Sequence, residues 1–139
     1  MGLRDRLRKW FGGVEGKDLA SLNRAVYHGN LNQARELLDR DSSLVDGRDD
    51  LGRTPLHYAA WRGQREMAEL LIAKGADLNS KTDRGHTPLY LAVRKNQRTV
   101  VELLLASGAD VNAGNQFGER PIHSAGAQIA ELLRQHGAR

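Results

Sequence analysis

The chain has 139 residues, a formal net charge of +4 and no cysteine, so disulfide bonds, thiolate metal sites and cysteine nucleophiles are excluded. Hydrophobic residues make up 40% of the sequence and charged residues 27%, which favours a folded globular domain over a disordered chain. No apolar run approaches the roughly 20 residues needed to cross a bilayer, and the N-terminus lacks the apolar core of a secretory signal, so we expect a cytoplasmic protein.

Residues 1–11 are predicted to form a short amphipathic helix. Basic side chains alternate with apolar ones that recur at helical spacing, and the apolar positions are Leu3, Leu7, Trp10 and Phe11. Such a helix could cover the open end of the fold that follows, lie on an anionic membrane surface, or occupy a groove of a partner protein. The sequence leaves these three interpretations open. Residues 12–17 are rich in glycine and predict a linker.

The basic excess is concentrated in this N-terminal segment. Residues 1–17 hold five basic and two acidic side chains, whereas the remaining residues are close to neutral. A nucleic-acid-binding function, which requires a concentrated basic face, is therefore not expected.

One sequence pattern occurs three times at a fixed interval in the rest of the chain. The pattern begins at Gly52, Gly85 and Gly118, which lie 33 residues apart, and such a period is the signature of stacked structural repeats. Its first copy reads Gly-Arg-Thr-Pro-Leu-His-Tyr-Ala-Ala. The glycine tolerates a positive φ, the threonine can cap a helix, and proline suits the first helical position. Each copy therefore predicts the start of a helix.

A second helix is predicted to follow the first in each repeat. Gly63, and Asn96 at the matching position of the next repeat, indicate a tight turn with a left-handed backbone conformation. Apolar residues at helical spacing come after each turn, and Gly75 and Gly108 predict the ends of the second helices. The repeat unit is therefore a helix, a turn, a second helix and an extended loop.

Four such units are predicted, at about residues 18–51, 52–84, 85–117 and 118–139, and the outer two depart from the pattern. The first unit lacks the Thr-Pro pair, and Asp18 is predicted to cap its first helix. In the fourth unit Arg120 replaces the capping threonine and several residues are missing, so its first helix should be short or distorted. We interpret both outer units as caps of the array.

The chain resembles the ankyrin repeat family over residues 18–139. The resemblance is carried by Thr-Pro-Leu-His at residues 54–57, by the 33-residue step, and by Gly-Ala-Asp at residues 75–77 and 108–110. It implies an all-α, ankyrin-type helix-turn-helix solenoid of about four repeats with connecting loops, preceded here by the short N-terminal amphipathic helix. It also implies a non-catalytic interaction module or adaptor without a cofactor. His57 and His123 would then have a structural role, their ring nitrogens bonding backbone between repeats.

The sequence contains no pattern that predicts catalysis or a metal site. Two of the five histidines share their repeat position with Tyr90, which cannot ligate zinc as histidine does, and the others lack metal-ligand spacing. Two Asx pairs recur with the period, and we interpret them as turn residues and not as calcium ligands; they are Asp77 with Asn79 and Asp110 with Asn112. No catalytic, cofactor-binding or metal-binding residue is therefore assigned.

By the same resemblance, a partner protein is expected to dock on the concave side of the array, at the loop tips and the ends of the first helices. These positions are rich in aromatic and basic residues, types that dominate interface hot spots: Tyr27, His28, Leu51, Arg53, Trp61, Arg62, Arg84, His86, Arg94, Lys95 and Phe117. We expect the partner to present an acidic or mixed acidic and apolar segment. The alternative is a peripheral membrane adaptor, whose N-terminal helix contacts an anionic membrane through Leu3, Leu7, Trp10 and Phe11.

Overall fold

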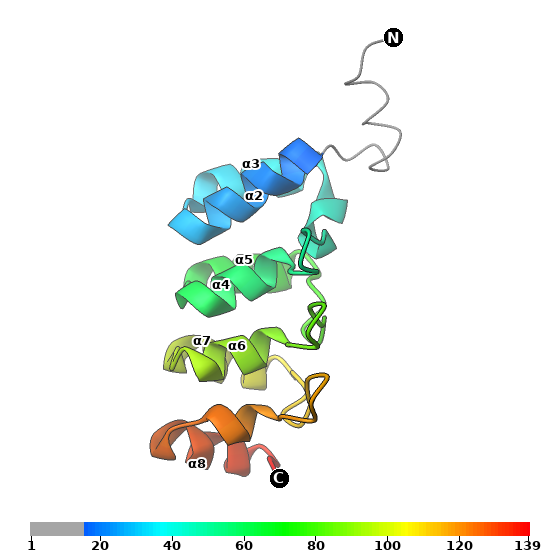
Figure 1. The fold of residues 1–139 in the computed structure, drawn as a ribbon. Helices are drawn as coiled ribbons and strands as arrows, with labels where there is room; N and C mark the ends of the chain where they lie inside the picture. The colour runs from blue at the N-terminus through cyan, green and yellow to red at the C-terminus, as the bar shows by residue number, and fades with distance from the viewer. Residues whose placement is uncertain (1–15) are drawn as a thin grey trace.

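The computed structural model describes residues 16–139, and every regular element within them is helical (Figure 1). In chain order these elements are α2 (Gly16–His28), α3 (Leu31–Arg40), the 3₁₀ helix η1 (Ser42–Asp46), α4 (Pro55–Arg62), α5 (Arg65–Ala73), α6 (Pro88–Arg94), α7 (Arg98–Ala106), the 3₁₀ helix η2 (Pro121–Ser124) and α8 (Ala127–Gln135). The predicted helix of residues 1–11 lies outside the described residues.

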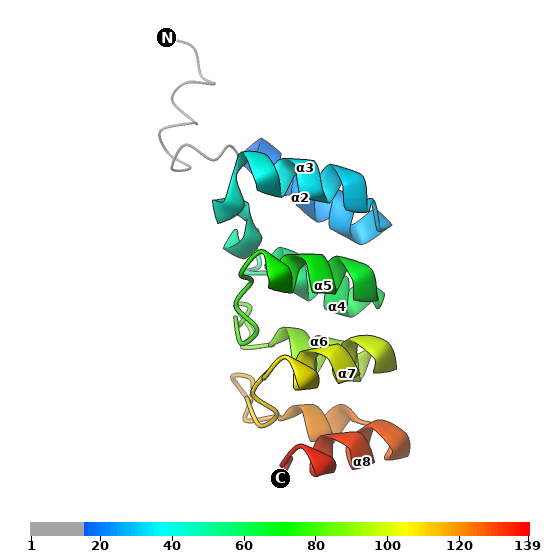
Figure 2. The ribbon, with the colours of Figure 1, turned by 180° about the vertical axis from the view of Figure 1, so that it is seen from behind.

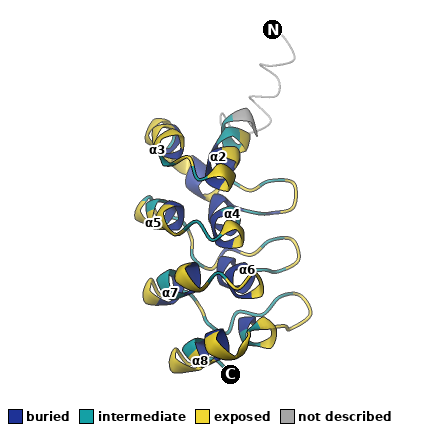
Figure 3. Ribbon diagram, turned by 90° about the vertical axis from the view of Figure 1, so that its left-hand side faces the viewer, coloured by how far each residue is buried: buried dark blue, intermediate teal, exposed yellow. Residues whose placement is uncertain are grey.

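The helices stack in pairs along a single column. α2 pairs with α3, α4 with α5 and α6 with α7, while η2 and α8 form the opposite end (Figures 1 and 2). Seen from the side, the first helices lie between the second helices and the connecting loops, which project to one side of the column (Figure 3). The all-α repeat array predicted from the sequence is confirmed.

Each regular repeat begins its first helix with the predicted Thr-Pro pair. Pro55 and Pro88 are the first residues of α4 and α6, where the missing N–H costs no helical hydrogen bond. The hydroxyl of Thr87 accepts a hydrogen bond from a backbone N–H in the first turn of α6 (3.1 Å), which satisfies one of the free donors at the helix start. The turns that follow contain the expected left-handed residues, Gly63 (φ 70°) and Asn96 (φ 57°).

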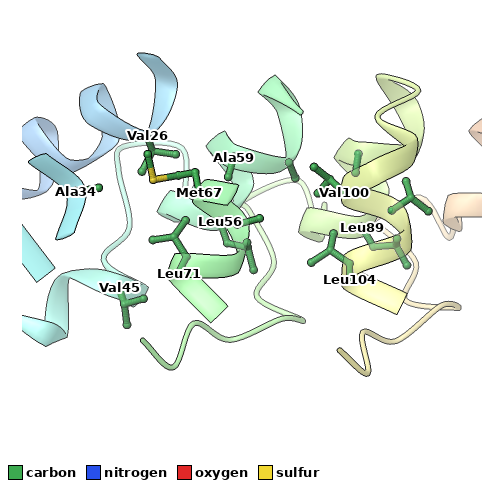
Figure 4. Close-up of a cluster of buried hydrophobic side chains, with 14 of the residues drawn as sticks. Val26, Ala34, Val45, Leu56, Ala59, Met67, Leu71, Leu89, Val100 and Leu104 are labelled. Atoms are coloured by element: carbon green, nitrogen blue, oxygen red, sulfur yellow. The ribbon is translucent and has the colours of Figure 1, made fainter. Parts of the chain in front are cut away.

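A continuous apolar core runs along the column, and Figure 4 shows part of it. Its side chains come from both helices of each repeat, including Leu56 and Ala59 of α4, Met67 and Leu71 of α5, Leu89 of α6, and Val100 and Leu104 of α7. Burying one large apolar side chain stabilises the fold by about 1.5–3 kcal/mol. Because these side chains pack against neighbouring repeats, the array and not the single repeat supplies the stability.

The connecting loops form three stacked turns, which we name the finger loops (residues 48–53, 81–86 and 114–119). Each turn is closed by a backbone hydrogen bond of 2.9–3.0 Å between its second and last residues. Each turn is also joined to the next one. The N–H of Asp83 donates to the carbonyl oxygen of Leu51 (3.0 Å), and the N–H of Gln116 donates to that of Arg84 (3.1 Å). The finger loops therefore form one hydrogen-bonded ladder.

The recurring Asx residues stabilise turns and also connect repeats. Oδ1 of Asp77 accepts a hydrogen bond from the N–H of Asn79 (2.9 Å), and Oδ1 of Asp110 accepts one from the N–H of Asn112 (3.0 Å). Oδ1 of Asn79 accepts a further bond from the N–H of Asp110 in the next repeat (2.8 Å). The interpretation of these residues as turn residues is confirmed.

Both outer repeats differ from the regular ones. The last repeat differs as predicted, whereas the start of the first repeat does not. The first helix of the last repeat is reduced to the short 3₁₀ helix η2, as expected. The first helix, α2, begins at Gly16, so the prediction that Asp18 caps it is wrong, and the last two residues of the predicted linker are helical. Asp18 lies instead in the first helical turn, where its carboxylate interacts favourably with the positive end of the helix dipole.

Both ring nitrogens of His57 form hydrogen bonds, one within its own repeat and one to the third repeat. Nδ1 accepts a hydrogen bond from the backbone N–H of Thr54 (3.0 Å), which places the ring proton on Nε2, and Nε2–H donates to the carbonyl oxygen of His86 (2.8 Å). The implied structural role is therefore confirmed for His57. His123 makes the equivalent local bond from the N–H of Arg120 (2.9 Å) but is exposed, so its contact does not join repeats within the described residues.

The His57 side chain lies in an environment that disfavours its charged form. The residue is 1% exposed, and this burial lowers the pKa of His57 to about 4. The imidazole is therefore neutral near pH 7, as its two hydrogen bonds require.

Gly85→Ala should destabilise the fold more than Gly118→Ala. Both glycines have a positive φ, 80° and 74°, so alanine costs about 1–2 kcal/mol at either position. A Cβ at Gly85 would also lie 2.7 Å from the backbone nitrogen of Gln116 in the next finger loop, whereas nothing lies within 4 Å of one at Gly118. Urea denaturation should show an additional loss of about 1 kcal/mol or more for Gly85→Ala. Equal losses would contradict close stacking of the finger loops.

The free energy of unfolding should fall as the pH is lowered from 6.5 to about 4. The ordinary pKa of histidine is 6.5 and that of folded His57 is about 4, so unfolding takes up a proton in this interval. The depressed pKa of His57 contributes about 3 kcal/mol to the free energy of unfolding. This contribution is complete above pH 6.5 and is lost below about pH 4. Denaturation at a series of pH values measures this slope.

His57→Asn is the matched variant, because Asn23 occupies the same position in the first repeat. It should lower the stability at neutral pH and flatten the pH dependence. A slope that persists in His57→Asn would assign the proton uptake to another group.

Candidate partner-binding site

Two neighbouring hollows lie on the surface formed by the finger loops and the first helices. The central groove has a volume of about 480 Å³ and lies between the second and third repeats; it is lined by Tyr27, Leu51, Arg53, His57, Tyr58, Trp61, Thr82, Asp83, Arg84, His86, Leu91 and Arg94. The first-repeat groove, of about 700 Å³, lies between α2, η1 and the first finger loop. Tyr27, Arg53 and Tyr58 line both grooves, so the two form one continuous surface.

Cations from the next repeat hold the aromatic side chains at the ends of α2 and α4. The guanidinium of Arg62 lies 4.3 Å from the centre of the Tyr27 ring, and the ammonium group of Lys95 lies 4.6 Å from the centre of the Trp61 ring. Such contacts at partly exposed sites contribute about 0.5–1 kcal/mol. Trp61 nevertheless remains 39% exposed. Arg62 and Lys95 therefore position aromatic side chains, and neither lines a groove. Their contact with a partner stays a prediction.

The charge of Arg53 is balanced within the fold by Asp49. Nε of Arg53 donates to Oδ2 of Asp49 (2.8 Å), and the hydroxyl of Tyr58 donates to the same oxygen (2.5 Å). Burial acts to raise the pKa of Asp49, but hydrogen bonds from Tyr58, Arg53 and Leu51 outweigh it and hold that pKa below its usual value. Burial and the Asp49 carboxylate raise the pKa of Tyr58 to about 12. Arg53 is therefore not a free positive charge.

Arg84 and Arg94 carry the uncompensated positive charge of the central groove. Within the described part of the chain neither arginine forms an ion pair. Both lie near His86, whose imidazole stacks on the ring of Tyr90 with the ring centres 4.6 Å apart. Burial, followed by the charges of Arg94 and Arg84, lowers the pKa of His86. The groove thus combines a neutral imidazole with two arginines that have no ion-pair partner in residues 16–139.

The structure gathers most of the predicted contact residues into one groove. Seven of them line the central groove, namely Tyr27, Leu51, Arg53, Trp61, Arg84, His86 and Arg94. His28 lines the first-repeat groove, and Phe117 is 75% exposed at the tip of the third finger loop, outside both linings. The contacts predicted at Leu3, Leu7, Trp10 and Phe11 lie outside the described residues.

Tyr58 and Leu91 also line the central groove, although the sequence pattern did not indicate them. Tyr58 and Leu91 lie on helices whose apolar residues mostly form the core. Leu91 follows Tyr58 by 33 residues. Their shared repeat position is the feature of the sequence that could have identified them as groove residues. Asp83, beside Arg84 at the tip of the second finger loop, also lines the groove.

Residues 16–139 contain no group of three or more histidine, cysteine, aspartate or glutamate side chains that could hold a metal ion. No helix in that part of the chain is long and apolar enough to cross a membrane.

Comparison with known proteins gives matches along most of the array. Residues 13–82 match a family model described as "Ankyrin repeats (3 copies)", and residues 84–116 match one described as "Ankyrin repeat". The chain is 42% identical over 66 residues to ARF GTPase-activating protein GIT1 of Homo sapiens, which covers 47% of this chain and 9% of that protein. It is 39% identical over 64 residues to protein phosphatase 1 regulatory subunit 27 of Homo sapiens, which covers 46% of this chain and 41% of that protein.

A third relative is Ankyrin repeat domain-containing protein 49 of Drosophila melanogaster. The identity is 40% over 48 residues, which is 34% of this chain and 22% of that protein. In each case the match therefore spans less than half of the relative's length.

Proposed function

The chain belongs to the ankyrin repeat family, and on this premise we propose that it binds a partner protein through the central groove without catalysing a reaction. Ankyrin repeats imply a protein-interaction module. The observation that best supports the location is that seven predicted contact residues line one groove around the partly exposed Trp61. Tryptophan, tyrosine and arginine are enriched at interface hot spots, because they bury a large area or form charge-assisted hydrogen bonds.

The lining favours a partner segment that is acidic, or one that mixes acidic and apolar residues. Among the described residues Arg84 and Arg94 have no ion-pair partner, whereas Asp83 is the one acidic residue of the lining. Leu51 and Trp61 are exposed by 55% and 39% and offer apolar area to a bound side chain. A basic segment would meet like charge here and is therefore disfavoured.

The proposed role of the protein is that of an adaptor or regulator in the cytoplasm. One relative is named a regulatory subunit and another a GTPase-activating protein, but the matches cover only 41% and 9% of these proteins. A shared fold does not transfer a partner, because ankyrin-type surfaces differ in their exposed side chains. The partners of these relatives are therefore not assigned to this chain.

Trp61→Ala should weaken partner binding by about 2 kcal/mol or more, as truncation of a hot-spot residue does. The substitution removes a large aromatic surface from the central groove. Affinity purification from the source cell, read by mass spectrometry, identifies the partner, and calorimetry with that partner measures the dissociation constant.

Arg134→Ala is the control for this experiment, because Arg134 is exposed on α8 and lines neither groove. It should leave the dissociation constant unchanged, and both variants should keep the helical circular dichroism of the wild type. An unchanged dissociation constant for Trp61→Ala would place the binding site elsewhere.

A second candidate function, a peripheral membrane adaptor, is favoured by the apolar and basic pattern of residues 1–11. Sedimentation with anionic liposomes tests it. Binding that weakens with added salt and disappears when residues 1–12 are deleted would support it. Equal sedimentation of the full chain and the deletion variant would exclude anchoring by this segment.

A further inference from the structure

We propose that Arg84, Arg94 and His86 form an anion subsite in the central groove, which holds a carboxylate side chain of the partner segment. This inference rests on the proposed function and specifies where the acidic part of the partner binds. Arg84 and His86 belong to the second finger loop, and Arg94 is the last residue of α6. All three line the same groove, although α6 and the loop are separate elements.

The balance of charge in the groove favours an anion at this point. Arg53 is paired with Asp49 at 2.8 Å. The other charged residues of the lining are two cations, Arg84 and Arg94, and one anion, Asp83, so the net charge there is positive. A guanidinium can donate two parallel hydrogen bonds to one carboxylate, which makes arginine well suited to this ligand. The same charges exclude a cation, so the nearby aromatic rings do not form a cage for a lysine or arginine of the partner.

The apolar part of the groove further restricts the partner segment. Trp61 and Leu91 line the groove beside the charged residues, and Leu51 extends the apolar surface at the first finger tip. A segment in which acidic and large apolar side chains alternate would satisfy both parts of the groove. A uniformly acidic segment would leave the apolar surface uncovered.

His86 couples binding of the carboxylate to proton uptake. In the free protein, burial and the charges of Arg94 and Arg84 keep the pKa of His86 below its usual value. A carboxylate bound between these groups offsets their repulsion and favours the imidazolium form, so this pKa rises in the complex. The affinity should therefore increase as the pH falls from the pKa of the complex towards the pKa of the free protein.

The other groups near His86 do not account for the proton that is taken up when the carboxylate binds. Glu119, on the third finger loop, acts to raise the pKa of His86, but burial and the two arginines outweigh it. The ring of Tyr90 stacks on the imidazole, and Nε2–H of the neutral His57 donates to the His86 carbonyl oxygen. The remaining charged residues of the lining are Asp83 and the paired Arg53.

NMR titration of the full chain with two matched peptides tests the subsite. The probe is acetyl-Leu-Glu-Leu-Glu-Leu-amide, and the control peptide has glutamine in place of each glutamate. The glutamate peptide should raise the imidazole pKa of His86, assigned by comparison with His86→Gln. It should bind about tenfold more tightly than the glutamine peptide, the factor expected for one charge-assisted hydrogen bond. Equal affinities for the two peptides would overturn the subsite.

Two arginine variants distinguish the subsite from the overall charge of the protein. Arg84→Gln and Arg94→Gln should each raise the pKa of His86 in the free protein, because a neighbouring positive charge is lost. Each should also weaken binding of the glutamate peptide about tenfold and leave that of the glutamine peptide unchanged. Arg134→Gln changes the net charge equally and should do neither. Unchanged affinity in the first two variants, or an equal loss in Arg134→Gln, would overturn the subsite.

The subsite and the proposed function fail in different ways. A partner that is lost with Trp61→Ala but retained with both arginine variants would keep the proposed function and overturn the subsite. A partner that binds Trp61→Ala as tightly as the wild type would overturn the central groove as the binding site, whatever the peptides show.

Discussion

Each repeat must approach the next one closely enough for their backbones to form hydrogen bonds, and the rest of the structure depends on this approach. A Cβ at Gly52 would lie 2.9 Å from the backbone nitrogen of Asp83, and one at Gly85 would lie 2.7 Å from that of Gln116. Only a residue without a side chain fits at these two crossings. The stability of the fold therefore resides in the contacts between neighbouring repeats, as it does in repeat proteins generally.

The same stacking builds the surface on which a partner would bind. Residues about one repeat apart meet across it, as Arg62 meets Tyr27 at 4.3 Å and Lys95 meets Trp61 at 4.6 Å. Because backbone hydrogen bonds hold the finger loops in place, the side chains at their tips have little part in folding. Such positions can change without disturbing the core, which is why one fold can present many different binding surfaces.

Equivalent positions in successive repeats have different roles, and their neighbours determine which. His57 is buried and joins two repeats, whereas His123 at the same position is exposed. Asn23 occupies this position in the first repeat, where it is buried with an Oδ1 that has no hydrogen-bond partner among the described residues. The first-repeat groove lies beside it. Within residues 16–139, Oδ1 of Asn23 therefore makes no counterpart of the hydrogen bond by which His57 joins the second and third repeats.

The sequence by itself determined the all-α repeat array, the helix starts at Pro55 and Pro88 and the turns at Gly63 and Asn96, because these signals act within a few residues of the chain. It also identified most residues of the central groove, through their repeat positions. Only the tertiary structure decided that Arg53 is paired with Asp49 and that Lys95 lies over the Trp61 ring. It also decided that Arg84 and Arg94 have no ion-pair partner within residues 16–139 and lie near His86. Those properties depend on the distances between side chains of different elements, and the sequence pattern does not give these distances.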